Sequence, residues 1–156
     1  MPWTPFDVPY ELHTNRELEF MLERGKPLAH FSDTYPPDPN ESVVPRAAFA
    51  AYVADGVFEG CEFVELFETQ LPQSPQACGT IHVFYVQRSE AWRIDAYIAM
   101  MAEGKKSGWN ERLERRQGTL LGYTDAENSA HIAHMLRAPH ARDFPWLRQL
   151  MQERGL

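Results

Sequence analysis

The stretch CEFVELFETQLPQSPQACGTIHVFYVQR, residues 61–88, decides the fold class of this chain. Two segments within it, residues 62–70 and 79–87, are rich in the β-branched and aromatic residues that favour strands. The segment between them, residues 71–78, is polar and contains two prolines, which are typical of a loop. We therefore predict an antiparallel hairpin over residues 62–87 at the centre of a small sheet.

Outside this hairpin the pattern is mainly helical. A short apolar run, residues 28–32, predicts one further strand, and a proline-rich loop over residues 33–42 follows it. Apolar residues at helical spacing, bounded by glycine, proline or capping residues, predict helices at residues 15–24, 45–56, 90–102, 109–121, 124–137 and 145–154. The order predicts an α+β, helix-dominated fold in which five or six helices pack on a small antiparallel sheet.

Length and composition predict one domain. The 156 residues, 44% of them hydrophobic, suffice for one core, with a proline-rich arm at residues 1–10. The net charge of -7 argues against binding nucleic acid or an anionic membrane by bulk attraction. Residues 1–78 hold 13 acidic and 4 basic residues, whereas residues 79–156 hold 9 and 11. This asymmetry could let two copies associate as a homodimer, although a solvated surface explains it equally well.

The sequence also suggests a compartment. Residues 1–10 have neither the basic nor the apolar segment of a signal peptide, and no apolar window reaches the length of a membrane span. We therefore expect a bacterial-type cytoplasmic protein without membrane insertion. Cys61 and Cys78 are accordingly expected to be reduced thiols.

One candidate catalytic pair is Glu65 and His82 on the predicted hairpin. On the first strand Phe63, Glu65 and Phe67 share a face, so a buried face would hold the carboxylate between two rings. A turn near residues 74–75 places His82 opposite Phe67 and diagonal to Glu65, within reach of general acid–base chemistry. His30 could join the pair if its strand lies beside the hairpin. Alternatively, Glu65 points to solvent or pairs with an arginine.

A second candidate site lies on the predicted helix after Thr124. Glu127, His131 and His134 are spaced i, i+4 and i+7 and therefore share one stripe of the helix. Carboxylate and imidazole are ligand types that a divalent metal accepts. The spacing matches no established metal motif, and a polar stripe facing solvent is the alternative. The sequence identifies no other cofactor.

Two functions remain open, because nucleotide-binding, hydrolase and zinc-ribbon motifs are absent from the sequence. The first is a binding or regulatory module whose ligand is a small molecule or a partner protein. Aromatic side chains would provide its contacts: Trp3, Phe6, Phe63, Phe67 and Trp146. The second is a small enzyme that acts on a small molecule through the Glu65–His82 pair or through the metal stripe.

Overall fold

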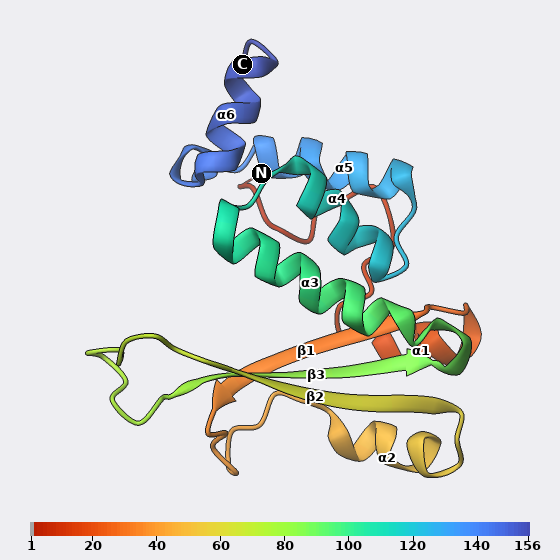
Figure 1. Ribbon diagram of the computed structural model, residues 1–156. Coiled ribbons are helices and arrows are strands. Elements are labelled where there is room, and N and C mark those ends of the chain that lie inside the picture. Colours follow the sequence, from red (N-terminus) through yellow and green to blue (C-terminus); the bar gives the residue numbers. More distant parts are fainter. Residues whose placement is uncertain (1) are drawn as a thin grey trace. The chain divides into compact units, whose positions relative to one another are not determined.

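The computed structural model describes residues 2–156 and contains, within them, six α-helices and one three-stranded antiparallel sheet (Figure 1). In chain order the elements are α1 (Glu17–Glu23), β1 (Leu28–Tyr35), α2 (Arg46–Ala54), β2 (Phe58–Leu66), β3 (Gly79–Gln87), α3 (Trp92–Ser107), α4 (Glu111–Leu120), α5 (Asp125–Leu136) and α6 (Pro145–Glu153). The predicted helix-dominated α+β class is confirmed.

Internal contacts divide the chain into two compact units. Glu17–Ile94 forms one, which we call the sheet unit. The second, which we call the helical unit, combines the chain up to Arg16 with Asp95–Leu156. The boundary falls within α3, near its first turn. The single domain expected from the length stays a prediction.

The sheet has the strand order β1-β3-β2, with β3 in the centre. β1 runs to Tyr35, so the expected loop after residue 32 begins later, because Asp33–Tyr35 continue to pair with β3. β2 lies about four residues earlier than predicted and pairs Phe63 with His82. The predicted register assumed pairing close to the tip, but the chain leaves the ladder after Leu66 and forms a long loop. The shift is even, so every side chain keeps its predicted face.

One hydrophobic cluster of the sheet unit lies on one face of the sheet. Alternate residues of β3, among them Val83 and Tyr85, pack there with Phe49 of α2 and Phe58 of β2, all buried. The rings of Phe49 and Tyr85 stack with centroids 4.0 Å apart. Burial of such side chains contributes roughly 1.5–3 kcal/mol each, which explains why β3 is the most apolar strand.

Local capping explains where the helices of the helical unit begin. The side chain of Asn110 accepts from the amide of Leu113 at the start of α4. Thr124 and Glu127 form the predicted capping box of α5. The sequence predicted a break between Gly104 and Gly108, and α3 continues through Gly104 and ends at Ser107, within that stretch. A Cβ at position 104 would lie 2.6 Å from the ring of Trp109, so this glycine admits the indole and does not end the helix.

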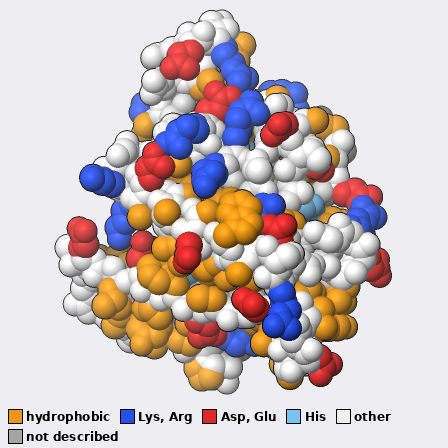
Figure 2. Space-filling view, turned by 45° about the vertical axis from the view of Figure 1, so that its right-hand side comes forward, with side chains coloured by type: hydrophobic (Ala, Val, Ile, Leu, Met, Phe, Trp, Pro, Cys, Tyr) orange, Lys and Arg blue, Asp and Glu red, His pale blue; other side chains and the backbone are white. Residues whose placement is uncertain are grey.

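The surface mixes charged and apolar groups. Acidic and basic side chains are interspersed with hydrophobic ones on the face shown in Figure 2. No helix within residues 2–156 is both long and apolar enough to cross a membrane. Cys61 and Cys78 are free thiols.

Candidate functional site

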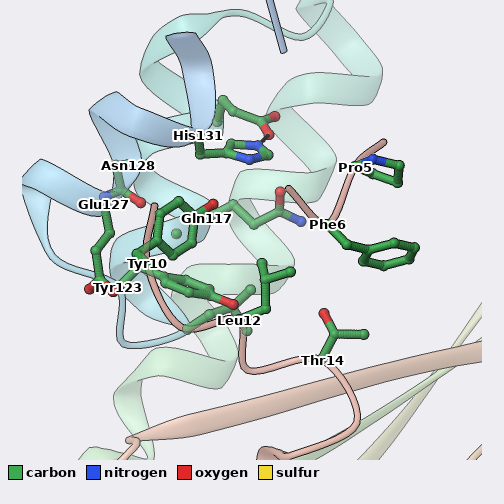
Figure 3. Close-up of a pocket in the computed structure, with 13 residues that line it drawn as sticks. Pro5, Phe6, Tyr10, Leu12, Thr14, Gln117, Tyr123, Glu127, Asn128 and His131 are labelled. Atoms are coloured by element: carbon green, nitrogen blue, oxygen red, sulfur yellow. Dashed lines mark hydrogen bonds and ion pairs between the residues drawn. The ribbon is translucent and has the colours of Figure 1, made fainter. Parts of the chain in front are cut away.

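A cavity of about 340 Å³ lies within the helical unit, between the N-terminal arm and helices α4 and α5. The arm contributes Pro5, Phe6, Tyr10 and other side chains. Figure 3 shows Tyr10 beside the residues of the two helices, whereas the ring of Phe6 points away from them. The size falls within the usual range for small-molecule sites. The remaining lining residues are Leu12, Thr14, Glu114, Gln117, Gly118, Leu121, Tyr123, Glu127, Asn128 and His131.

The N-terminal segment that lines the cavity, residues 5–14, is fixed at both ends to the helices of the helical unit and the turn between them. Near its start the Trp3 indole N–H donates to the carbonyl oxygen of His134 (3.1 Å), and His134 Nε2 donates to that of Thr4 (2.6 Å). The rings of Trp3 and His134 stack with centroids 4.9 Å apart. Near its end the His13 amide donates to the Tyr123 hydroxyl (2.9 Å), and the rings of these two residues also stack. The cavity wall is therefore held in place rather than formed by a loose tail.

A carboxylate–imidazole pair lies in the wall opposite the arm. Glu114 Oε1 lies 2.7 Å from His131 Nε2, and its Oε2 accepts from the indole N–H of Trp109 at 2.5 Å. The Glu114 side chain is 15% exposed and that of His131 is 37% exposed. The carboxylate is thus held by two donors, while the imidazole keeps a face toward the cavity.

Tyrosine hydroxyls add polar groups to this region. Burial raises the pKa of Tyr10 to about 12, and repulsion from Tyr123, Glu127 and Glu114 adds to the shift. Tyr10 therefore keeps its proton at neutral pH and can donate a hydrogen bond. Burial also raises the pKa of Tyr97 to about 12, and its hydroxyl accepts from the Gln117 amide at 2.8 Å.

Close packing of α4 on α5 forms one side of the cavity. Asn128 is buried, and its amide donates to the Arg115 carbonyl oxygen (3.3 Å) and to Thr119 Oγ1 (3.0 Å). A Cβ at Gly118 would lie 2.8 Å from Asn128 Cγ, closer than real Cβ contacts allow. Glycine at position 118 therefore permits the two helices to approach at this point.

The predicted pair on the sheet is brought together within the sheet unit. His82 Nε2 lies 3.7 Å from Glu65 Oε1, and Glu65 is diagonal to His82 as expected, although Phe63 replaces Phe67 as the direct neighbour. His30 joins them, since its Nε2 lies 2.9 Å from His82 Nδ1 and the two rings stack. Burial, and then the neighbouring His82, lowers the pKa of His30 to about 4.

The group formed by Glu65, His82 and His30 differs from an open catalytic site, because its central residue, His82, is buried. The His82 side chain is 8% exposed, and its Nε2 atom is buried without a hydrogen-bond partner among residues 2–156. The Glu65 side chain is 35% exposed. The catalytic role of Glu65 and His82 stays a prediction.

The stripe on α5 does not converge on one point. Glu127 caps its own helix through the Thr124 amide, His131 pairs with Glu114, and His134 is buried against Trp3. Within residues 2–156, no three His, Cys, Asp or Glu side chains are arranged to hold a metal ion. This geometry gives the predicted metal site no support, because each of the three side chains has a different partner.

The five predicted contact aromatics lie in separate places. Phe6 lines the cavity and is 69% exposed. Trp3 and Trp146 are half-buried against an apolar cluster near the C-terminus that includes Leu147. In the sheet unit, Phe63 packs near His82, and Phe67 lines a shallow depression with Leu66 and Pro75. Their roles as contacts stay predictions.

Sequence reasoning missed Tyr10, Glu114 and Gln117 as site residues. Three residues that it did name, Phe6, Glu127 and His131, line the same cavity but were assigned to different roles. The available signal was the spacing of Glu114 and Gln117 on one face of α4. Using it required knowing that α4 packs on α5 and that the arm returns to both.

Comparisons of the chain with protein-family models, with curated proteins and with solved structures found no match.

Proposed function

We propose that the protein is a small-molecule binding module and that the ligand lies in the cavity between the arm and helices α4 and α5. The observation that carries this proposal is an aromatic-lined cavity whose arm is fixed at both ends. A wall that is already ordered does not have to be ordered on binding, which lowers the entropic cost of taking up a ligand. Apolar walls with a few polar groups are typical of such sites.

The exposed ring of Phe6 supports the same proposal. This side chain is 69% exposed although it borders the cavity. A ligand in the cavity would remove part of the ring from water, and burial of apolar surface stabilises a complex by roughly 25 cal/mol per Å². Phe6 therefore contributes little to folding and has apolar surface to offer to a ligand.

A fragment screen by ligand-observed NMR tests the proposal. Phe6→Ala should weaken the binding of the fragments that the wild-type protein takes up, because it removes a wall of the cavity. Thr14→Trp, which adds a large ring at an exposed lining position, should weaken the same fragments. Circular dichroism would confirm that both variants keep the native helix content.

Phe144→Ala is the matched control. Phe144 is also exposed, at 41%, and does not line the cavity, so its removal should leave fragment binding unchanged. The proposal is wrong if no fragment binds. It is also wrong if the fragments that bind respond to Phe144→Ala as strongly as to Phe6→Ala and ignore Thr14→Trp.

Acid–base catalysis in the same cavity is a second candidate, favoured by the Glu114–His131 pair. A carboxylate that holds one ring nitrogen orients the imidazole, and the other nitrogen, Nδ1, could then take a proton from a ligand. The fragments that bind would be incubated with the wild-type protein and with His131→Gln. A fragment converted by the wild type and left intact by the variant supports catalysis, whereas unchanged spectra with both proteins exclude it for those fragments.

A further inference from the structure

We propose that the cavity selects an organic cation, an alkylated or protonated amine, over neutral and anionic molecules of the same shape. This inference rests on the proposed binding function and names the ligand class of that site. It is carried by the combination of aromatic rings and carboxylates around the cavity (Figure 3).

The charges of the lining residues all favour a cation. Glu114 and Glu127 are the acidic side chains among them, and no lysine or arginine lines the cavity. Even if His131 carries a proton, the lining keeps one excess negative charge. Two unit charges 4 Å apart interact by about 1 kcal/mol in water and about 4 kcal/mol near a protein surface, so the sign of a ligand matters here.

Aromatic rings add a second attraction of the same sign. Phe6, Tyr10 and Tyr123 line the cavity, and the rings of Tyr10 and Tyr123 meet edge to face with centroids 5.8 Å apart. The face of an aromatic ring attracts an ammonium group, and cages of such rings recognise alkylated amines. An apolar surface alone would serve a neutral ligand equally well, so the carboxylates and the rings together define the preference.

The raised pKa of Tyr10 agrees with a negative field from the same two carboxylates. Burial raises the pKa of its hydroxyl to about 12, and repulsion from Tyr123, Glu127 and Glu114 contributes in the same direction. Groups that oppose a new negative charge on this hydroxyl also oppose an anionic ligand beside it and attract a cationic one.

Three probes of nearly one shape test the preference on the full chain. Choline carries a positive charge, 3,3-dimethylbutan-1-ol replaces its nitrogen by carbon and is neutral, and 3,3-dimethylbutanoate is negative. Each would be titrated at constant ionic strength while NMR follows the rings of Tyr10 and Tyr123. Choline should bind about tenfold more tightly than the alcohol, and the carboxylate should bind weakest.

Glu127→Gln is the deciding variant. Glu127 Oε1 accepts from the Thr124 amide, and glutamine keeps an acceptor for this cap while removing the charge. We expect choline affinity to fall about threefold to tenfold and alcohol affinity to stay the same. Glu68→Gln removes the same charge from an exposed residue outside the lining, so it should change neither affinity.

The outcomes separate this inference from the proposed function. Equal affinities for choline and the alcohol, or equal effects of Glu127→Gln and Glu68→Gln, overturn the cation preference. If neutral fragments bind in a Phe6-dependent manner and choline does not bind, the preference is wrong and the binding function stands. If neither fragments nor probes bind, both fail.

Discussion

Gly118→Ala should destabilise the protein, although the same change in an ordinary helix interior is stabilising. Alanine is favoured over glycine within a helix by about 1 kcal/mol. At position 118 the new methyl group would lie 2.8 Å from Asn128 Cγ, so the buried amide has to move. Its bonds to Arg115 and Thr119 are then lost, at about 1 kcal/mol each, and overpacking costs about 1–3 kcal/mol more. We expect a net loss of about 2–4 kcal/mol.

A double-mutant cycle with Asn128→Ala tests this reasoning. Once the amide is absent, Gly118→Ala should stabilise the protein by about 1 kcal/mol, so its effect reverses sign. The coupling between the two positions is then about 3–5 kcal/mol, well above the roughly 0.5 kcal/mol expected for independent sites. Urea denaturation of the four proteins, followed by far-UV circular dichroism, gives each free energy of unfolding. A stabilising Gly118→Ala in the wild-type background, or additive effects, would refute the proposed contact.

Three further predictions concern stability. Burial lowers the pKa of Lys26 from its ordinary value of 10.5 to about 7 in the folded protein. Between pH 7 and 10.5 the unfolded chain therefore binds more protons than the folded protein, and the free energy of unfolding should rise with pH across this window. Between pH 7 and 9.5 the wild type should gain about 3 kcal/mol relative to Lys26→Met, measured by urea denaturation. Thr124→Ala should cost about 1 kcal/mol through the lost cap of α5, whereas Thr124→Ser should cost little; equal losses would contradict the cap. Gly79→Ala should lower the free energy of unfolding by more than about 2 kcal/mol, because the new methyl group would lie 3.0 Å from the Leu66 backbone. An unchanged thermal midpoint would contradict that contact.

Local sequence signals predicted most of the secondary structure, because the helices here are bounded by residues whose chemistry acts locally. Thr124 and Glu127 bond to each other's backbone within one turn, so their spacing alone predicts the start of α5. Gly104 shows the limit of this approach. Its role depends on the ring of Trp109, a tertiary contact, and sequence reasoning therefore took it for a helix stop.

Strand register depended on a contact that the sequence does not encode locally. The residues between Leu66 and Gly79 form a long loop, and nothing in their composition fixes where the ladder ends. The error of four residues is even, so every side chain stays on its face. Glu65 nevertheless lies diagonal to His82, because the error moved its direct partner from Phe84 to Thr80, and both residues flank His82 on the same face. The faces of the sheet were thus predictable and the exact neighbours were not.

The cavity was hidden for a different reason: its two walls are more than a hundred residues apart in the chain. Phe6 was read as part of an extended arm, and His131 as part of a stripe on a single helix. Pairing Glu114 with His131 requires α4 to pack on α5, and closing the cavity requires the arm to return to both. Such a site follows from tertiary packing, for which a single sequence offers no direct signal.

Charge counts along the sequence also conceal the electrostatics of this site. Counted by fold unit, the sheet unit holds 12 acidic and 5 basic residues, whereas the helical unit holds 10 of each. The net charge of the protein therefore belongs to the sheet unit, and the helical unit is balanced. Its cavity is nevertheless lined by two carboxylates and by none of the unit's ten lysine and arginine residues. Because exposed charges are screened within about 10 Å at 0.1 M salt, these lining groups, and not the total charge, set the electrostatic field that a ligand of the proposed site would meet.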